Sequence, residues 1–187
     1  MSTRSRVQLC TSLTILAALL SAGAFAQVPL RDDNSGPYNV TILEGGEGLT
    51  RKLEPGTASL DANGAWSMTG WVNPRRVQPG PAALLVVGNT PADARAIFLG
   101  DGKPGLYADN QVLVSDSAVA NGSWTAIAAT YDGTTARLYV NGRELKSKAM
   151  QVAAAGDAIS VAPLLPEMQG APHFGGQLAD LKLHSRH

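Results

Sequence analysis

The sequence predicts an all-β protein, a two-sheet antiparallel β-sandwich of the jelly-roll type. Short segments of strand length recur about every 8–12 residues along the chain, with Gly, Asn and Asp turns between them. Beyond residue 26, no long segment repeats apolar residues at the spacing of an amphipathic helix. The pair Asn141-Gly142 is the strongest hairpin signal, because both residues readily adopt the positive φ angles of a type I′ turn.

The first part of the mature chain contains several expected strands, each ended by a turn-forming residue. Residues 65–72 alternate most clearly, with Trp66 and Met68 on one face and Thr69 and Trp71 on the other. Since a tryptophan falls on each face, we interpret this segment as a central strand covered on both sides. The expected strands here are 40–44, 49–53, 65–72, 83–87, 96–99, 105–108 and 111–114.

The second part is organised around residues 123–148, which read as three strands joined by two tight turns. The strict alternation and the hairpin turn explain Tyr139 and Asn141 as scaffold, so replacing either with alanine should lower stability first. After a weakly patterned stretch, a final strand is expected to place Leu178 in phase with Asp180, and Leu181 on the opposite face. The expected strands are 124–131, 136–140, 143–146, 159–162 and 177–184.

The N-terminal residues 1–26 have the three parts of a cleaved signal peptide. A short basic start precedes an apolar run at 7–20, and Ala24-Phe25-Ala26 is a small-x-small cleavage site. The run is shorter than the ~20 apolar residues that a membrane span needs, and no later segment is long and apolar enough. We therefore expect export by a Sec-type signal, to the periplasm or the extracellular space of a bacterium, with residues 27–39 as a flexible lead-in and 40–187 as the domain.

Cleavage after Ala26 would change the charge and remove the cysteine. It removes Arg4 and Arg6, two of the 15 basic residues, which leaves 13 basic against 15 acidic residues. Without a basic surplus, nucleic acid is not an expected partner. Because Cys10 is the only cysteine, the exported domain would have no disulfide, thiol nucleophile or cysteine metal site.

The segment SWTAIAATYDGTTARLYVNGREL, from Ser123, resembles the signature of laminin-G-like jelly-roll domains in the concanavalin A-like lectin/glucanase superfamily. The resemblance extends to WSMTGWVNP from Trp66, IFLGDGKPGLYAD from Ile97 and FGGQLADLKLHSR from Phe174, and so covers roughly residues 48–186. It implies many antiparallel strands in two packed sheets. It also implies that Trp66, Trp71 and Trp124 occupy core positions.

The resemblance implies a binding module and not an enzyme. Catalytic relatives use closely spaced carboxylates, and their Glu-x-Asp-x-x-Glu spacing is absent from this sequence. The expected function is an exported, non-catalytic module that recognises carbohydrate or a cell-surface or extracellular protein. The alternative is a structural interaction domain that packs on a partner or on the catalytic domain of a larger glycan-active enzyme. A glycan-active hydrolase is the least favoured reading.

Recognition is expected in the less patterned loops around Arg75, 101–116 and His173. Exposed aromatic rings with polar neighbours are the usual sugar platforms, whereas core packing is the alternative role for each ring. The candidate ligand-binding residues are Arg75, Tyr107, Asp109, Asn110 and Phe174.

Calcium is the one cofactor that the resemblance suggests, since some relatives hold Ca²⁺ at the rim of the sandwich. Carboxylate oxygens suit this hard cation, and Asp101, Asp109 and Asp116 lie in neighbouring loops. The alternative is that these residues are present because aspartate forms turns. Asp132, in the turn of the signature, is interpreted as a structural cap of backbone N–H groups.

Overall fold

Two antiparallel sheets of six strands each account for the part of the chain that the computed structural model describes, residues 41–44, 49–52, 60–163 and 173–185. All of these residues belong to one unit, Gly36–His187. The expected signal peptide and lead-in lie outside them. The first sheet has the order β1 (Thr41–Glu44), β12 (Gly175–Ser185), β3 (Trp66–Pro74), β8 (Thr125–Tyr131), β9 (Thr135–Val140) and β10 (Arg143–Ala149).

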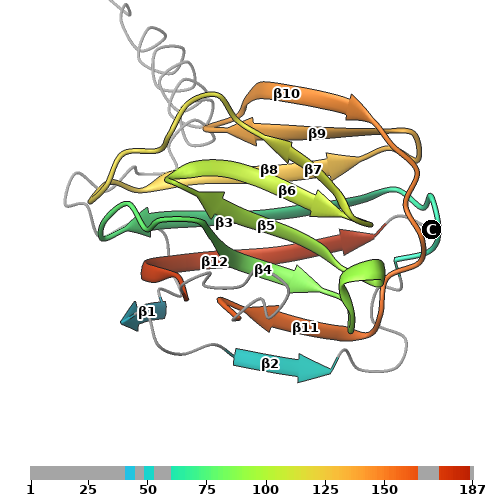
Figure 1. The fold of residues 1–187 in the computed structure, drawn as a ribbon, viewed down its shortest axis with the longest axis horizontal. Coiled ribbons are helices and arrows are strands. Elements are labelled where there is room, and N and C mark those ends of the chain that lie inside the picture. Colours follow the sequence, from blue (N-terminus) through green and yellow to red (C-terminus); the bar gives the residue numbers. More distant parts are fainter. Residues whose placement is uncertain (1–40, 45–48, 53–59, 164–172, 186–187) are drawn as a thin grey trace, which may run out of the picture. The chain divides into compact units, whose positions relative to one another are not determined.

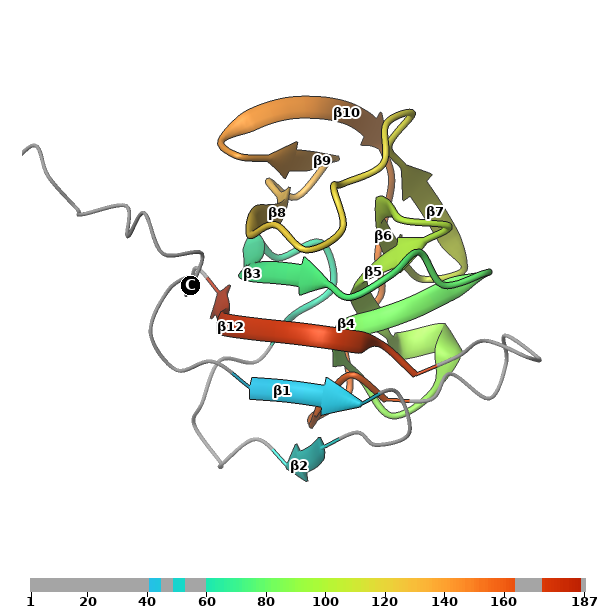
Figure 2. The same ribbon diagram turned by 90° about the vertical axis from the view of Figure 1, so that its left-hand side faces the viewer.

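The second sheet packs against the first, as Figures 1 and 2 show from two sides. Its order is β2 (Leu49–Lys52), β11 (Ala158–Val161), β4 (Pro81–Val87), β5 (Arg95–Gly100), β6 (Lys103–Ala108) and β7 (Gln111–Val114). The expected all-β, two-sheet sandwich is therefore confirmed. A single 3₁₀ turn, η1 (Pro91–Asp93), lies in the β4–β5 connection, where the sequence indicated a turn. None of the described helical segments has the length and apolar character to cross a bilayer.

The hydrophobic core lies between the sheets and is built by alternation along the strands. In β3, Trp66, Met68 and Val72 are buried, whereas the alternate residues Thr69 and Trp71 are only half-buried. The expectation that β3 is covered on both sides is therefore wrong. One face belongs to the core, and the other is the outer surface of the first sheet.

Three hairpins have two-residue turns in which both central residues have positive φ. These turns are Asp101-Gly102 between β5 and β6, Asp109-Asn110 between β6 and β7, and Asn141-Gly142 between β9 and β10. This is the type I′ geometry, whose twist matches that of the paired strands. The aspartates and asparagines at these positions are thus explained by the turns that they make.

Replacing Asn141 with alanine is expected to lower the free energy of unfolding by about 1–2 kcal/mol. Asn141 has φ 49°, and its Oδ1 accepts a hydrogen bond of 2.9 Å from the backbone N–H of Ala126. Urea denaturation of the purified protein measures the loss. In the control Asn141→Gly, the positive φ is kept and only the side-chain bond is lost, so the loss should be smaller. Equal losses in both variants would show that the backbone conformation is not the cause.

A β-bulge in β12 corrects the expected phase of the last strand. Ala179 pairs with Trp71 and Lys182 with Thr69, so Asp180 and Leu181 together face the single residue Gly70. Asp180 has φ 48°, and the extra residue reverses the alternation. Leu178 and Leu181 consequently both lie on the core side, contrary to the strict alternation that the sequence suggested. A Cβ on Gly70 would lie 2.4 Å from Cδ2 of Leu181, so the glycine makes room for this leucine.

Candidate functional site

The outer face of the first sheet carries half-exposed side chains in cross-strand rows. One row contains Lys182 on β12, Thr69 on β3, Ala128 on β8 and Tyr139 on β9, which are paired directly from strand to strand. The next rows are Trp71–Ala126 on one side and His184–Ser67–Thr130–Arg137 on the other. These residues share a face because side chains alternate along strands that are aligned in register.

A hollow of about 440 Å³ lies on this face, and we call it the Trp71 hollow. Trp71 and Tyr139 are its two aromatic lining residues, and they come from strands on either side of β8. Ala126 and Ala128 on β8 lie between them, so short side chains form a floor between two rings. This volume is within the range of roughly 300–1,000 Å³ that is typical of small-molecule sites.

Asp180 and Lys182 supply charged groups to the Trp71 hollow. They flank Leu181 in β12, and alternation along the strand turns both away from the core side on which Leu181 packs. A carboxylate accepts hydrogen bonds and an ammonium group donates them, and Thr69 beside them can do both. The hollow therefore combines aromatic surface with donors and acceptors for hydroxyl groups.

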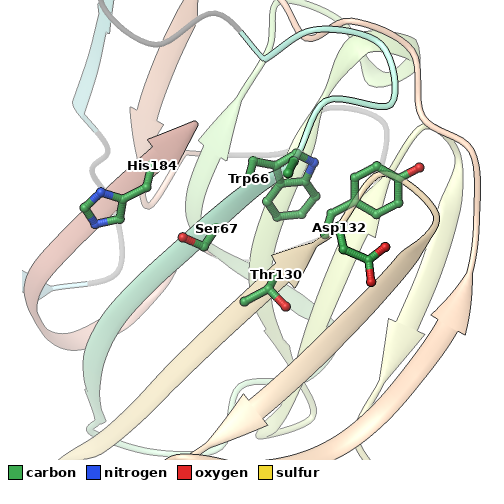
Figure 3. A pocket seen from close by; sticks show the side chains of 7 residues that line it. Trp66, Ser67, Thr130, Asp132 and His184 are labelled. Atoms are coloured by element: carbon green, nitrogen blue, oxygen red, sulfur yellow. The ribbon is translucent and has the colours of Figure 1, made fainter. Parts of the chain in front are cut away.

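A second hollow of about 350 Å³ lies further along the same face, and we call it the His184 hollow. Figure 3 shows His184 on β12, Ser67 on β3 and Thr130 on β8, together with Asp132 just beyond β8. Thr130 lines both hollows, so the two are adjacent. Trp66 lies behind this hollow with its ring in the core.

The outer face of the second sheet has a different character. Ala83, Val86, Ala96 and Phe98 on it are buried, and the ring of Phe98 lies over Gly105, where a Cβ would be 2.3 Å from Cζ. Both hollows described above lie on the outer face of the first sheet, where most of the lining side chains are partly exposed. This difference makes the first sheet the better candidate for ligand recognition.

Asp132 acts as the cap that the sequence predicted. Its Oδ1 accepts hydrogen bonds from the N–H groups of Thr134 at 3.0 Å and Thr135 at 2.8 Å, and its Oδ2 lies 2.6 Å from Nη1 of Arg137. The hydrogen bond from Arg137, followed by those from the turn, holds the pKa of the Asp132 carboxyl well below its usual range. Its charge is therefore neutralised locally.

Because the pKa of Asp132 is lowered in the folded state, the free energy of unfolding is expected to fall as the pH is lowered. A carboxyl group with a depressed folded-state pKa stabilises the protein above its unfolded pKa, and this contribution is lost as the pH falls. We expect the wild type to lose more unfolding free energy between about pH 5 and pH 3 than the Asp132→Asn variant does. Urea titrations at several pH values measure this. Arg137→Gln, which removes the main cause of the shift, should also flatten the profile, whereas parallel profiles would contradict the assignment.

The structure does not bring the expected calcium ligands together. Asp101 and Asp109 lie in the turns at opposite ends of β6, and Asp116 forms an ion pair of 2.7 Å with Lys146. Oδ1 of Asp101 accepts a hydrogen bond from the N–H of Gly80. Within residues 41–44, 49–52, 60–163 and 173–185, no group of three or more His, Cys, Asp or Glu is placed to hold a metal ion.

The structure brings only three of the expected ligand-binding residues together, Tyr107, Asp109 and Asn110 at the β6–β7 turn. Phe174 has no exposed surface and packs in the core, so it cannot be the exposed platform that the sequence suggested. The Tyr107 hydroxyl lies 2.9 Å from the carbonyl oxygen of Pro91 and 2.8 Å from Oδ1 of Asn110, beside Asp109 in the β6–β7 turn. Arg75 is exposed just after β3, where its N–H donates to the carbonyl oxygen of Gly175.

The candidate site residues that the sequence did not indicate are those of the Trp71 hollow. Trp71 was assigned to the core and Tyr139 to the scaffold, but both line the outer hollow. The alternation placed each on the correct face of its strand. It contained no signal to show that this face is only half covered.

Comparisons with known proteins agree with this architecture. The family model Laminin_G_3, described as the concanavalin A-like lectin/glucanases superfamily, matches residues 46–187. A comparison with curated proteins found no match. Among solved structures, mouse laminin α1 chain domains LG4-5 match with a TM-score of 0.60 and 16% identity, and the match covers 79% of this chain and 42% of that one.

Two bacterial structures are also similar in fold. Domain 4 of AbnA, a GH43 extracellular arabinanase from Geobacillus stearothermophilus in complex with arabinotriose, has a TM-score of 0.59 at 18% identity and covers 78% of this chain and 70% of that one. The CBM40 of an IT-sialidase from Ruminococcus gnavus, bound to α2,3-sialyllactose, has a TM-score of 0.56 at 18% identity, with 76% and 90% covered. Because the family model matches residues 46–187, most of the sequence, this chain belongs to the laminin-G-like family of the concanavalin A-like lectin/glucanase superfamily.

Proposed function

We propose that this protein is an exported, non-catalytic module that binds carbohydrate on the outer face of its first sheet. The observation that carries this proposal is the Trp71 hollow, where two aromatic side chains border a floor of alanines beside Asp180 and Lys182. Export rests on the signal-peptide pattern of residues 1–26, which predicts a periplasmic or extracellular location.

The chemistry of the hollow suits a sugar. One face of a sugar ring carries C–H groups that stack on an aromatic ring, and the hydroxyl groups around its edge need donors and acceptors. Trp71 and Tyr139 offer the first kind of surface, and Thr69, Asp180 and Lys182 the second. The similarity in fold to structures with bound arabinotriose and sialyllactose supports the same class of ligand.

The carboxylates at this face favour binding over hydrolysis. Glycoside hydrolases place two carboxyl groups roughly 5–9.5 Å apart across the bond that they cleave. Asp180 is the one carboxylate among the described residues lining the Trp71 hollow, and it lies beside Lys182. Asp132, in the neighbouring hollow, is already occupied by Arg137 and the N–H groups of its own turn.

Affinity electrophoresis and a glycan array, each run with Ca²⁺ and with EDTA, test the proposal. The purified protein is expected to bind at least one polysaccharide or array glycan, and to do so in EDTA, because stacking and hydrogen bonding need no metal. Loss of binding in EDTA would favour a calcium site in the aspartate turns over the sheet face. If no glycan is bound, and instead a defined extracellular protein partner binds, the carbohydrate proposal fails and the interaction-domain alternative holds. Release of sugar from any bound polysaccharide would overturn the non-catalytic assignment.

A further inference from the structure

We infer that the ligand is an uncharged, extended polysaccharide chain that lies along both hollows, and not a terminal sugar held in one of them. This inference rests on the proposed function and specifies its ligand class. It depends on how the two hollows are placed on the sheet and on the balance of their charges.

The two hollows form one continuous track along the strands. Thr130 lines both, and the lining residues on and just before β3 run from Ala65 and Ser67 in the His184 hollow to Trp71 in the other. The six steps from residue 65 to residue 71, at about 3.3 Å each, span roughly 20 Å, enough for about four sugar units. A single sugar ring would leave most of this length unoccupied.

The ends of the track lie at opposite ends of β9. Gly142, in the β9–β10 turn, lines the Trp71 hollow, whereas Asp132, in the β8–β9 turn, lines the His184 hollow. The track therefore follows the whole length of a strand from one turn to the next. This geometry fits a chain that runs along the strands.

The polar groups at the far end fit the hydroxyl groups of such a chain. Ser67 and Thr130 carry hydroxyl groups, and His184 is exposed on the neighbouring strand (Figure 3). Trp66 and Tyr131 are the Trp and Tyr residues among the described residues that line this hollow, and their rings are buried. Stacking at Trp71 and hydrogen bonding near His184 would thus hold different units of one ligand.

The charges along the track favour an uncharged ligand. Among the described residues, the charged ones that line it are Asp180, Lys182 and Asp132, and Asp132 is paired with Arg137 on the same face. The cationic side chains do not outnumber the carboxylates. A surface that binds a polyanion needs a surplus of positive charge, which this track does not have.

Titration calorimetry with oligosaccharides of two to six units, prepared from arabinan, xylan, mannan and β-1,4-glucan, tests the inference. For the polysaccharide that binds, affinity should rise with chain length up to about four units, since about four fit the track. In the double variant Ser67→Ala with His184→Ala, affinity for the hexasaccharide should fall about 10-fold, or about 1.4 kcal/mol, and affinity for the disaccharide much less. Affinity should also change little between low and high salt.

The possible results distinguish failure of the extended, uncharged ligand from failure of carbohydrate binding itself. Affinity independent of chain length, or a hexasaccharide that shifts no NMR amide signal of Ser67, Thr130 or His184, would overturn the extended chain and leave carbohydrate binding intact. Strong, salt-sensitive binding of polygalacturonate or heparin would overturn the uncharged ligand. Absence of binding to every glycan would overturn the proposed function itself. Because Ser67 and His184 lie on the outer face, their variants should fold, and a thermal melt checks this.

Discussion

Replacing Trp71 with alanine is expected to weaken carbohydrate binding by about 10- to 100-fold. Trp71 is half-buried on the outer face, where it forms one aromatic side of the hollow. Removing a large apolar side chain from water is worth about 1.5–3 kcal/mol, and each 1.4 kcal/mol corresponds to a factor of ten in Kd. If a sugar ring covers this indole, most of that energy is lost in the variant. Calorimetry with the oligosaccharide that the wild type binds best measures the effect.

The control is Tyr107→Ala, which removes a half-buried aromatic ring from the second sheet. This variant should bind the same ligand with unchanged affinity. The comparison also decides between two locations, because Tyr107 belongs to the loop region that the sequence favoured. If Tyr107→Ala loses binding and Trp71→Ala does not, recognition lies at the β6–β7 turn and the sheet-face assignment is wrong. A thermal melt of each variant separates lost binding from lost folding.

Local sequence signals predicted the strands well because each strand carries its own pattern. Each described strand overlaps a segment that the alternation and the turns indicated, and β7 has the expected bounds, Gln111–Val114. The turn at Asn141-Gly142 has the predicted positive φ angles at both residues. A turn of this kind depends on two adjacent residues, so the sequence contains all the information that it needs.

The site could not be predicted in the same way, because it depends on contacts between distant segments. The alternation showed that Trp71 faces away from Met68, but not which face would meet the second sheet. That depends on which strands pair and how the two sheets pack. The polar side of the hollow comes from Asp180 and Lys182, which are more than one hundred residues away from Trp71 and reach it through the β12–β3 pairing.

Two other predictions, the phase of the last strand and the exposure of Phe174, were wrong because they also depend on contacts between distant segments. The bulge at Asp180 is not visible in a strict two-residue alternation, and Phe174 looked like a loop aromatic because it directly precedes a strand. Its ring is buried, and a Cβ on Gly176 would lie 2.8 Å from its Cζ, so the glycine makes space for the ring. Both features are fixed by packing partners that only the folded chain supplies.

Arg95 is a buried charge that the sequence did not reveal, and its removal should have the largest effect on stability. Only 1% of its surface is exposed, and the strand expected at 96–99 stopped short of it. Its position follows the alternation, because Arg95, Ile97 and Leu99 share a face that points into the core. A charged side chain at such a position must find partners, since burying an unpaired charge is costly.

The partners of Arg95 join the core to two loops. Its Nη2 donates to the carbonyl oxygens of Asp61, at 3.2 Å, and Ala153, and its guanidinium lies 5.6 Å from the centre of the Trp66 ring. That ring in turn lies 5.9 Å from the ring of Tyr131, whose hydroxyl donates to the carbonyl oxygen of Met150. Arg95 therefore holds the segments before β3 and after β10 against the core.

Arg95→Ala is expected to lower the free energy of unfolding by about 3–5 kcal/mol, because it leaves a cavity and deprives two carbonyl groups of their donor. Arg95→Met should cost less, about 1–2 kcal/mol, since it keeps most of the side-chain volume and removes a costly charge. Burial lowers the pKa of Arg95 to about 10, which leaves the group charged at neutral pH. Its Nη1 and the Nε1 of Trp66 are buried without a hydrogen-bond partner among the described residues.

Urea denaturation of both variants at pH 7 shows whether Arg95 stabilises the fold mainly through the volume of its side chain or through its charged, hydrogen-bonding group. A small loss for Arg95→Met would show that packing over Trp66 accounts for most of the stabilisation. Equal and large losses for both variants would contradict the expected order. They would mean that the bonds to Asp61 and Ala153 contribute more than the desolvated charge costs, so that tethering of the two loops is the main role of Arg95.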